Sequence, residues 1–109
     1  MTTFDDREKG FEKKFALDQE QEFRAHARRD KLFGLWAASK LGLTGTAADA
    51  YAKSIVVEDI KEPGDADVLR KVIADFAAKG VRSNAADLSK TLGEMAVKAR
   101  EQIANEIKS

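Results

Sequence analysis

Cationic side chains cluster in the stretch "RAHARRDK", where Arg24 and Arg28 stand four residues apart. On a helix this spacing places two guanidinium groups one turn apart, so they could clamp a phosphate or a carboxylate. Glu20, Glu22 and Asp30 are close enough along the chain to neutralise these cations through helical ion pairs. The sequence leaves both interpretations open, and a solvated face of paired charges is the commoner arrangement.

Reaction chemistry has little support in the sequence. The chain has one histidine, His26, and no cysteine, which excludes a thiolate zinc site and a nucleophilic triad. The glycines form no phosphate-binding loop, and the acidic run "EDIKEPGDAD" lacks the spacing of a calcium loop. Asp65 and Asp67 are better explained as a helix cap and a first-turn acid. An enzyme is the weakest hypothesis, and its activity would have to depend on His26 or on the region of Asp65.

Composition narrows the class of protein further. The 109 residues suffice for one domain, and 19 basic residues balance 19 acidic ones. Zero net charge argues against general nucleic-acid binding and against docking on anionic lipid. No apolar run approaches the roughly 20 residues that span a bilayer, and the first ten residues do not look like a secretory signal. We therefore expect a soluble, intracellular protein that binds no nucleic acid and does not insert into a membrane.

Three breaks divide the chain into four helical segments, which predicts an all-α, four-helix bundle. The breaks are "GLTG" at 42–45, "KEPGD" at 61–65 and "KGVRSN" at 79–84. Either Ser83 or Asn84 could cap the last helix. The motif "SIVV" in the second segment suits a strand locally, but no partner strand exists, so a helix is predicted there.

Apolar residues mark the faces of these helices. The first segment has a local apolar face at Leu32, Leu35 and Trp36. The last has the clearest stripe, which consists of Leu88, Leu92, Met95, Ala99, Ile103 and Ile107.

The first 18 residues are too polar to build a core, yet Phe4, Phe11 and Phe15 fall on one stripe if they form a helix. In a helix unbroken as far as Leu41, Phe33 would share that stripe. Such a polar helix is barely stable in water without tertiary packing. Either the rings cover the bundle of their own chain, or they bind a partner. We predict a mobile, amphipathic arm at residues 1–18 and a bundle at residues 19–109.

Four strings in order along the chain resemble the ζ-subunit family, small inhibitors of the bacterial F1Fo-ATP synthase described from alphaproteobacteria. They are "MTTFDDRE", "KFALD", "ARRDKLFGLWAA" and "EPGDADVLRK". The similarity extends from Met1 past Phe76, and its order and spacing make the match specific.

The resemblance implies a function for the arm. It would become helical on inserting between the catalytic α and β subunits and the γ shaft of F1, where it blocks rotation driven by ATP hydrolysis. It would not act as an enzyme, and it would be held at the inner membrane only through F1. The family pattern assigns the F1 contact to eight residues, namely Phe4, Asp5, Asp6, Arg7, Glu8, Lys14, Phe15 and Asp18. Phe11 is not a family feature, and its place on the stripe adds it to this set.

The resemblance also implies weak, regulatory binding of ADP or ATP on the bundle, with no required cofactor and no metal. Arg28, Arg29 and Trp36 are candidates from charge and stacking potential. The alternative is a nucleotide-responsive helical adaptor whose arm packs on its own bundle.

Overall fold

The computed structural model describes residues 17–62 and 64–108. They form four helices: α2 (Gln19–Lys40), α3 (Gly45–Lys61), α4 (Ala66–Ala78) and α5 (Ala85–Lys108). The described parts contain no strand, which confirms the prediction of an all-α, four-helix fold. They also contain no helix long and apolar enough to cross a membrane. The predicted contacts from Phe4 to Phe15 lie outside the described residues.

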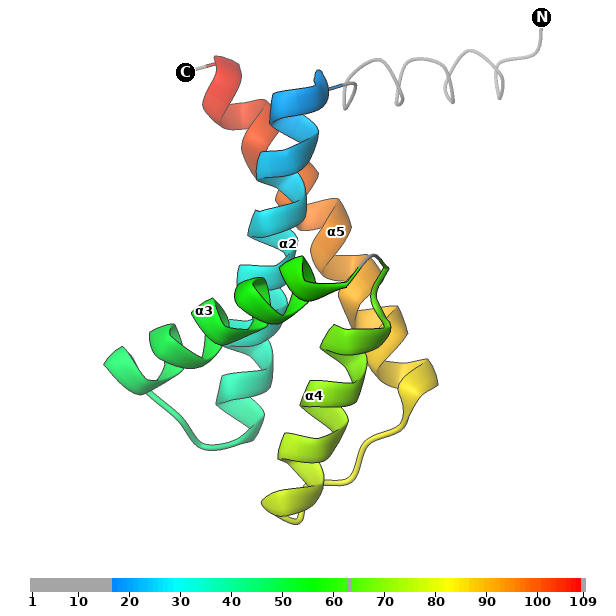
Figure 1. Ribbon diagram of the computed structural model, residues 1–109. Coiled ribbons are helices and arrows are strands. Elements are labelled where there is room, and N and C mark those ends of the chain that lie inside the picture. The colour runs from blue at the N-terminus through cyan, green and yellow to red at the C-terminus, as the bar shows by residue number, and fades with distance from the viewer. Residues whose placement is uncertain (1–16, 63, 109) are drawn as a thin grey trace, which may run out of the picture.

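Helices α2 and α5 run antiparallel, and α3 crosses α2 (Figure 1). Helix α4 packs against α3 and α5. The start of α2 and the end of α5 lie side by side and project beyond the other two helices (Figure 1). Two ion pairs join these ends: Arg100 with Glu22 at 2.5 Å, and Arg28 with Glu106 at 2.7 Å.

The core lies where all four helices meet. Phe33, Ile55 and Phe76 are among its largest fully buried side chains. Trp36 stacks on Phe33 with ring centroids 5.7 Å apart and also contacts Phe76. The remaining buried members of this cluster are Ala37, Val68, Val72, Leu88 and Leu92.

The predicted breaks have the expected local causes. After α2 and after α4 the chain turns at a glycine with positive φ, +78° at Gly42 and +74° at Gly80. In each case the following residue donates its N–H back to a helical carbonyl, as from Val81 to Phe76 at 2.8 Å. Asn84, rather than Ser83, caps α5, because its side chain accepts from the N–H of Asp87 at 2.8 Å.

Helix α3 contains the "SIVV" motif, so the prediction of a helix there is confirmed. Ile55 is fully buried while its neighbour Val57 is 49% exposed, a difference that fits a helical face. Local β-propensity did not decide the structure, because the segment packs across α2 and residues 17–62 and 64–108 contain no strand to pair with it.

The apolar faces predicted from the sequence differ in detail from those in the structure. Phe33, which an unbroken helix would place on the stripe of Phe4, Phe11 and Phe15, is fully buried in the core, and the other three rings lie outside the described residues. Leu32, Leu35 and Trp36 are only half-buried, because Phe33, Gly34, Ala37 and Ala38 form the buried face of this part of α2. The stripe of α5 holds as far as Ile103, whereas Ile107 is 48% exposed beyond the crossing of the helices.

The crossing of α2 and α3 is unusually close. A Cβ added to Gly34 would lie 2.6 Å from the Cα of Ala52 and 3.2 Å from the Cγ1 of Ile55. Only glycine allows the two backbones to approach in this way. This close approach fixes how α3 lies on α2. It therefore positions Asp30, one turn before Gly34 on α2, near Asp59, one turn after Ile55 on α3.

Candidate functional site

The N-terminal segment joins the bundle at a capped helix start. The carboxylate of Asp18 accepts from the N–H of Gln21 at 2.8 Å, and the side chain of Gln21 accepts from the N–H of Asp18 at 3.0 Å. This reciprocal capping box fixes the beginning of α2 at Gln19. Asp18 has a ψ of 179°, so its backbone is extended and not helical. The structure thus gives Asp18 a capping role, and its contact with F1 stays a prediction.

A partly buried polar cluster lies two to three turns further along α2, beside α3 and the start of α4. It consists of His26, Arg29, Asp30, Asp59 and Asp65. One Nη atom of Arg29 lies 2.9 Å from an oxygen of Asp30, 2.9 Å from one of Asp65 and 3.5 Å from one of Asp59. Asp30 is 1% exposed and Arg29 is 8% exposed. One guanidinium therefore serves three carboxylates from three segments of the chain.

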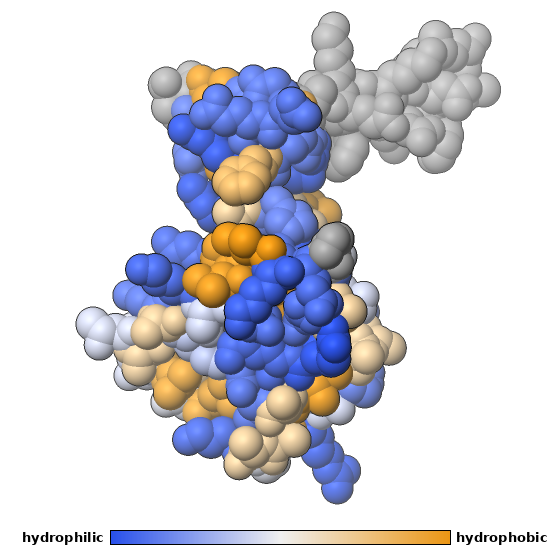
Figure 2. All heavy atoms as spheres, in the orientation of Figure 1, coloured by the Kyte–Doolittle hydropathy of each residue, from blue (hydrophilic) through white to orange (hydrophobic). Residues whose placement is uncertain are grey.

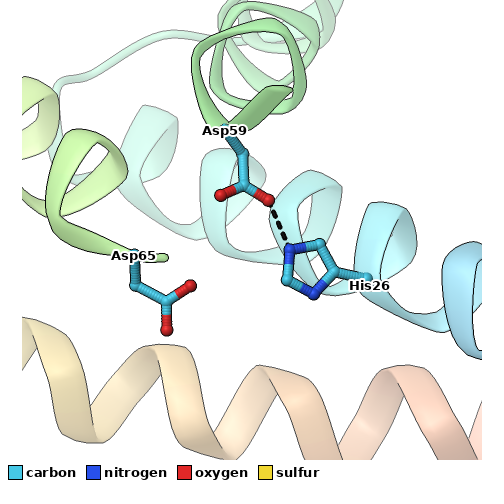
Figure 3. A group of neighbouring side chains, drawn as sticks. All are labelled: His26, Asp59 and Asp65. Atoms are coloured by element: carbon cyan, nitrogen blue, oxygen red, sulfur yellow. Dashed lines mark hydrogen bonds and ion pairs between the residues drawn. The ribbon is translucent and has the colours of Figure 1, made fainter. Parts of the chain in front are cut away.

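His26 closes the cluster on its solvent side. Its Nε2 lies 2.5 Å from the carboxylate of Asp59, and Figure 3 shows the two side chains turned toward one another, with Asp65 nearby. Because that nitrogen donates to Asp59, it cannot also accept from Arg29, whose Nη lies 3.1 Å away. The Arg29 atom is a close neighbour of the imidazole and not its hydrogen-bond donor.

Asp30 and Asp59, the two most buried carboxyls of the cluster, have pKa values shifted in opposite directions. Burial raises the pKa of Asp30 to about 8, and its hydrogen bond with Asp59 adds to this, while Arg29 acts in the opposite direction. Burial alone would raise the pKa of Asp59 as well, but hydrogen bonds from Asp30 and His26 outweigh it and lower that pKa. Burial would lower the pKa of Arg29, yet its acidic partners raise it. The pair thus holds a proton on Asp30 that stabilises the charge of Asp59.

The cluster resembles a metal site only in part. Ligand atoms of His26, Asp59 and Asp65 all lie within 4.8 Å of one another. However, the guanidinium of Arg29 already takes the place between these atoms where a cation would bind. The arrangement is an internal ion network that ties α2 to α3 and to the start of α4.

Because of Asp30, this network should make the protein more stable at acidic pH than at alkaline pH. Folded Asp30, with a pKa of about 8, binds one proton more than unfolded Asp30 between about pH 4 and 8. The free energy of unfolding should therefore fall as pH rises through that window, by at most about 1.4 kcal/mol per pH unit from this group. Below about pH 4 and above about pH 8 the contribution of Asp30 is constant.

Asp30→Asn tests this expectation, because an amide imitates the protonated carboxyl. Urea denaturation between about pH 5 and 9 should show that the variant gains stability relative to wild type as pH rises. Glu94→Gln, at an exposed position of α5, is the control, and its stability should change with pH as that of wild type does. Parallel profiles for wild type and Asp30→Asn would contradict the proton on Asp30.

The three nucleotide candidates do not face one shared cavity. Arg28 turns to α5, where it contacts Gln102 and Glu106, both at 2.7 Å. Arg29 lies in the polar cluster, and Trp36 packs on the core. The groove that Arg28 lines includes neither of the other two. Nucleotide binding by these residues stays a prediction, which ADP titration followed by Trp36 fluorescence would test.

The sequence reasoning missed the polar cluster. It paired Asp30 with surface arginines and treated Asp65 as a simple cap. Asp65 does occupy the N-cap position of α4, but its side chain makes no capping hydrogen bond and binds Arg29 instead. A signal was present, because the buried residues Ala25, Phe33 and Ala37 follow a four-residue spacing that includes Arg29.

Comparison with known proteins supports both the fold and its class. A protein with a solution NMR structure is 39% identical, with a TM-score of 0.69; the match covers 78% of this chain and 96% of that one. No curated protein matches the sequence significantly. The four-helix fold thus places the chain among small, all-helical proteins that have a solved representative.

The more particular assignment comes from a family model that matches residues 1–102. Its description is ATPase inhibitor subunit zeta, and the chain belongs to that family. This confirms the resemblance drawn from the sequence, and it makes the protein a member of a regulatory family whose target is an ATPase.

Proposed function

We propose that the protein inhibits ATP hydrolysis by the F1 sector of the F1Fo-ATP synthase through its N-terminal 18 residues. In this proposal the segment folds into a helix between the α, β and γ subunits and blocks rotation. The observation that carries it is the family match, which begins at residue 1 and so includes the whole segment. The protein would reside in the cytoplasm and be held at the inner membrane only through F1.

The architecture of the bundle supports this division of labour. The described helices build a buried core among themselves, and no buried side-chain polar atom in the described residues lacks a hydrogen-bond partner. Helix α2 begins at Gln19 with its own capping box, so residues 1–16 are not needed to start the first described helix. In the proposed complex Phe4, Phe11 and Phe15 bury apolar area in the partner, and each contributes roughly 1.5–3 kcal/mol before ordering costs.

The proposal is tested by hydrolysis assays on isolated F1 with the full chain and with a chain lacking residues 1–16. The deletion stops before Leu17, because Asp18 and Gln21 must remain to cap α2. We expect the shortened protein to keep its helical circular dichroism and to lose all inhibition. Inhibition that survives the deletion would contradict the proposal.

A control separates aromatic anchoring from the mere presence of the segment. Phe15→Ser should weaken inhibition by about tenfold or more in apparent affinity, because it removes one buried ring. Thr3→Ser leaves the rings and charges of the segment unchanged and should behave as wild type. Equal loss in both variants would show that the aromatic stripe is not the binding determinant.

A further inference from the structure

A groove between α2, α3 and α5 has an apolar lining that no described part of the chain covers. Its volume is about 380 Å³, and Ala27, Val56 and Ile103 are among the residues that line it. Phe23 forms one wall and is 71% exposed. A phenylalanine this exposed beside an apolar groove presents apolar area that a partner covering the groove would remove from water.

The apolar surface continues from this groove along α3. Ile60 lies one helical turn beyond Val56 and is 73% exposed, and Val57 is 49% exposed. Figure 2 shows such hydrophobic side chains gathered on one face of the molecule. We call the groove and this continuation the α2–α3 face, defined by Phe23, Ala27, Val56, Val57 and Ile60.

Cations border this face. Arg24, Arg28 and Lys31 line the groove from α2, and a second hollow of about 390 Å³ shares Lys31 and Val56 with it. That hollow adds Lys53 from α3. Arg28 is paired with Glu106 at 2.7 Å, but the described residues offer no hydrogen bond or ion pair to Lys31 or Lys53. Arg24 also pairs with Glu20 at 4.0 Å, and the acids that line the two hollows are Glu106 and Asp49. Four lining cations against two lining acids leave the border with an excess of positive charge.

We propose that the α2–α3 face binds an acidic amphipathic helix of the ATPase, as a second contact beside the N-terminal segment. This inference rests on the proposed function. A helix fits because Arg24, Arg28 and Lys31 follow steps of four and three residues, which match carboxylates placed at one-turn intervals on a partner helix. Its apolar side would cover Phe23 and Val56.

The position of the face favours the same partner that the N-terminal segment would bind. Phe23 lies five residues from the cap at Asp18, about 8 Å along the helix axis, and Lys31 lies about 20 Å from it. A complex that holds residues 1–16 therefore brings its own surface within reach of this face. A second copy of the chain fits less well, because a two-fold pairing would place lysines against lysines.

The test measures affinity and maximal inhibition separately, with the full-length chain and isolated F1. Phe23→Ser and the double variant Lys31→Glu/Lys53→Glu should each weaken binding by about tenfold or more. At saturation both should still inhibit completely, because the N-terminal segment is intact. The double variant should also lose much of the salt dependence of binding.

Matched controls come from the opposite side of α5. Val97 is 55% exposed and Lys98 is exposed, and neither lines the groove. Val97→Ser and Lys98→Glu should bind F1 as wild type does. Circular dichroism of every variant should match wild type, since the altered side chains are all exposed.

Several outcomes would overturn the proposal. Unchanged affinity of Phe23→Ser and of the double variant, with inhibition still lost on deletion of residues 1–16, would refute the docking face and leave the proposed function standing. Self-association of the wild type that disappears in Phe23→Ser would show a second copy as the occupant. Failure of the wild type to bind F1 would refute both proposals together.

Discussion

Replacing Arg29 by methionine is expected to lower the free energy of unfolding by about 3–5 kcal/mol. The guanidinium lies within 3.5 Å of carboxylate oxygens from Asp30, Asp59 and Asp65. Methionine fills a similar volume but has no charge, so it leaves the buried carboxylate of Asp59 without the guanidinium and removes the hydrogen bonds to Asp30 and Asp65. Since small domains are stable by only about 5–15 kcal/mol, this loss is a large share of the total.

Arg28→Met is the matched control, because it makes the same substitution at the position just before Arg29 in the same helix. Arg28 pairs with Glu106 across the surface, where the side chains are 29% and 52% exposed. Exposed pairs contribute about 1 kcal/mol or less. Urea denaturation followed by circular dichroism measures both variants.

A graded series sharpens this result. Arg29→Lys keeps the charge but loses the planar fork that reaches several carboxylates, so its stability should fall between wild type and Arg29→Met. If Arg29→Met were as stable as Arg28→Met, the polar cluster would not be an interdependent network.

Gly34→Ala should destabilise the protein by about 2 kcal/mol, although alanine is the better helix former. The new methyl group would lie 2.6 Å from the Cα of Ala52 and 3.1 Å from its Cβ. Because the nearest atom belongs to the backbone, α2 and α3 must move apart to accommodate it. Such overpacking outweighs the gain in helix propensity.

Gly93→Ala makes the same substitution at another helical glycine and should change the free energy of unfolding in the opposite direction. Gly93 lies within α5, and a Cβ added there meets no atom within 4 Å. This substitution should stabilise the protein by up to about 1 kcal/mol. The two variants are compared by the same denaturation experiment, and stabilisation in both cases would show that α2 and α3 do not approach as closely as described.

The helices and their ends were predictable because they follow from local chemistry. Gly42 and Gly80 turn the chain by adopting positive φ, and Asn84 offers a capping oxygen, whatever the rest of the protein does. The stripe on α5 was equally clear, since apolar residues recur there at helical spacing between charges. Each of these signals lies within a few residues of the structure it specifies.

The polar cluster was not predictable in the same way. Asp30 and Asp59 are 29 positions apart, and only the crossing of α2 with α3 brings them together. Charged residues on a helix usually face water, so Asp30 suggested a surface ion pair. The close crossing depends on Gly34, whose neighbour Ala52 could not be identified from the sequence alone.

The extended backbone at Asp18 has a mechanical consequence. The capping box begins α2 at Gln19, and the extended backbone of Asp18 does not follow the axis of that helix. If a partner binds the N-terminal segment as proposed, Asp18 is a point at which the chain can change direction between that segment and the bundle. The bundle could then turn to meet a neighbouring surface of the partner while α2 keeps its cap.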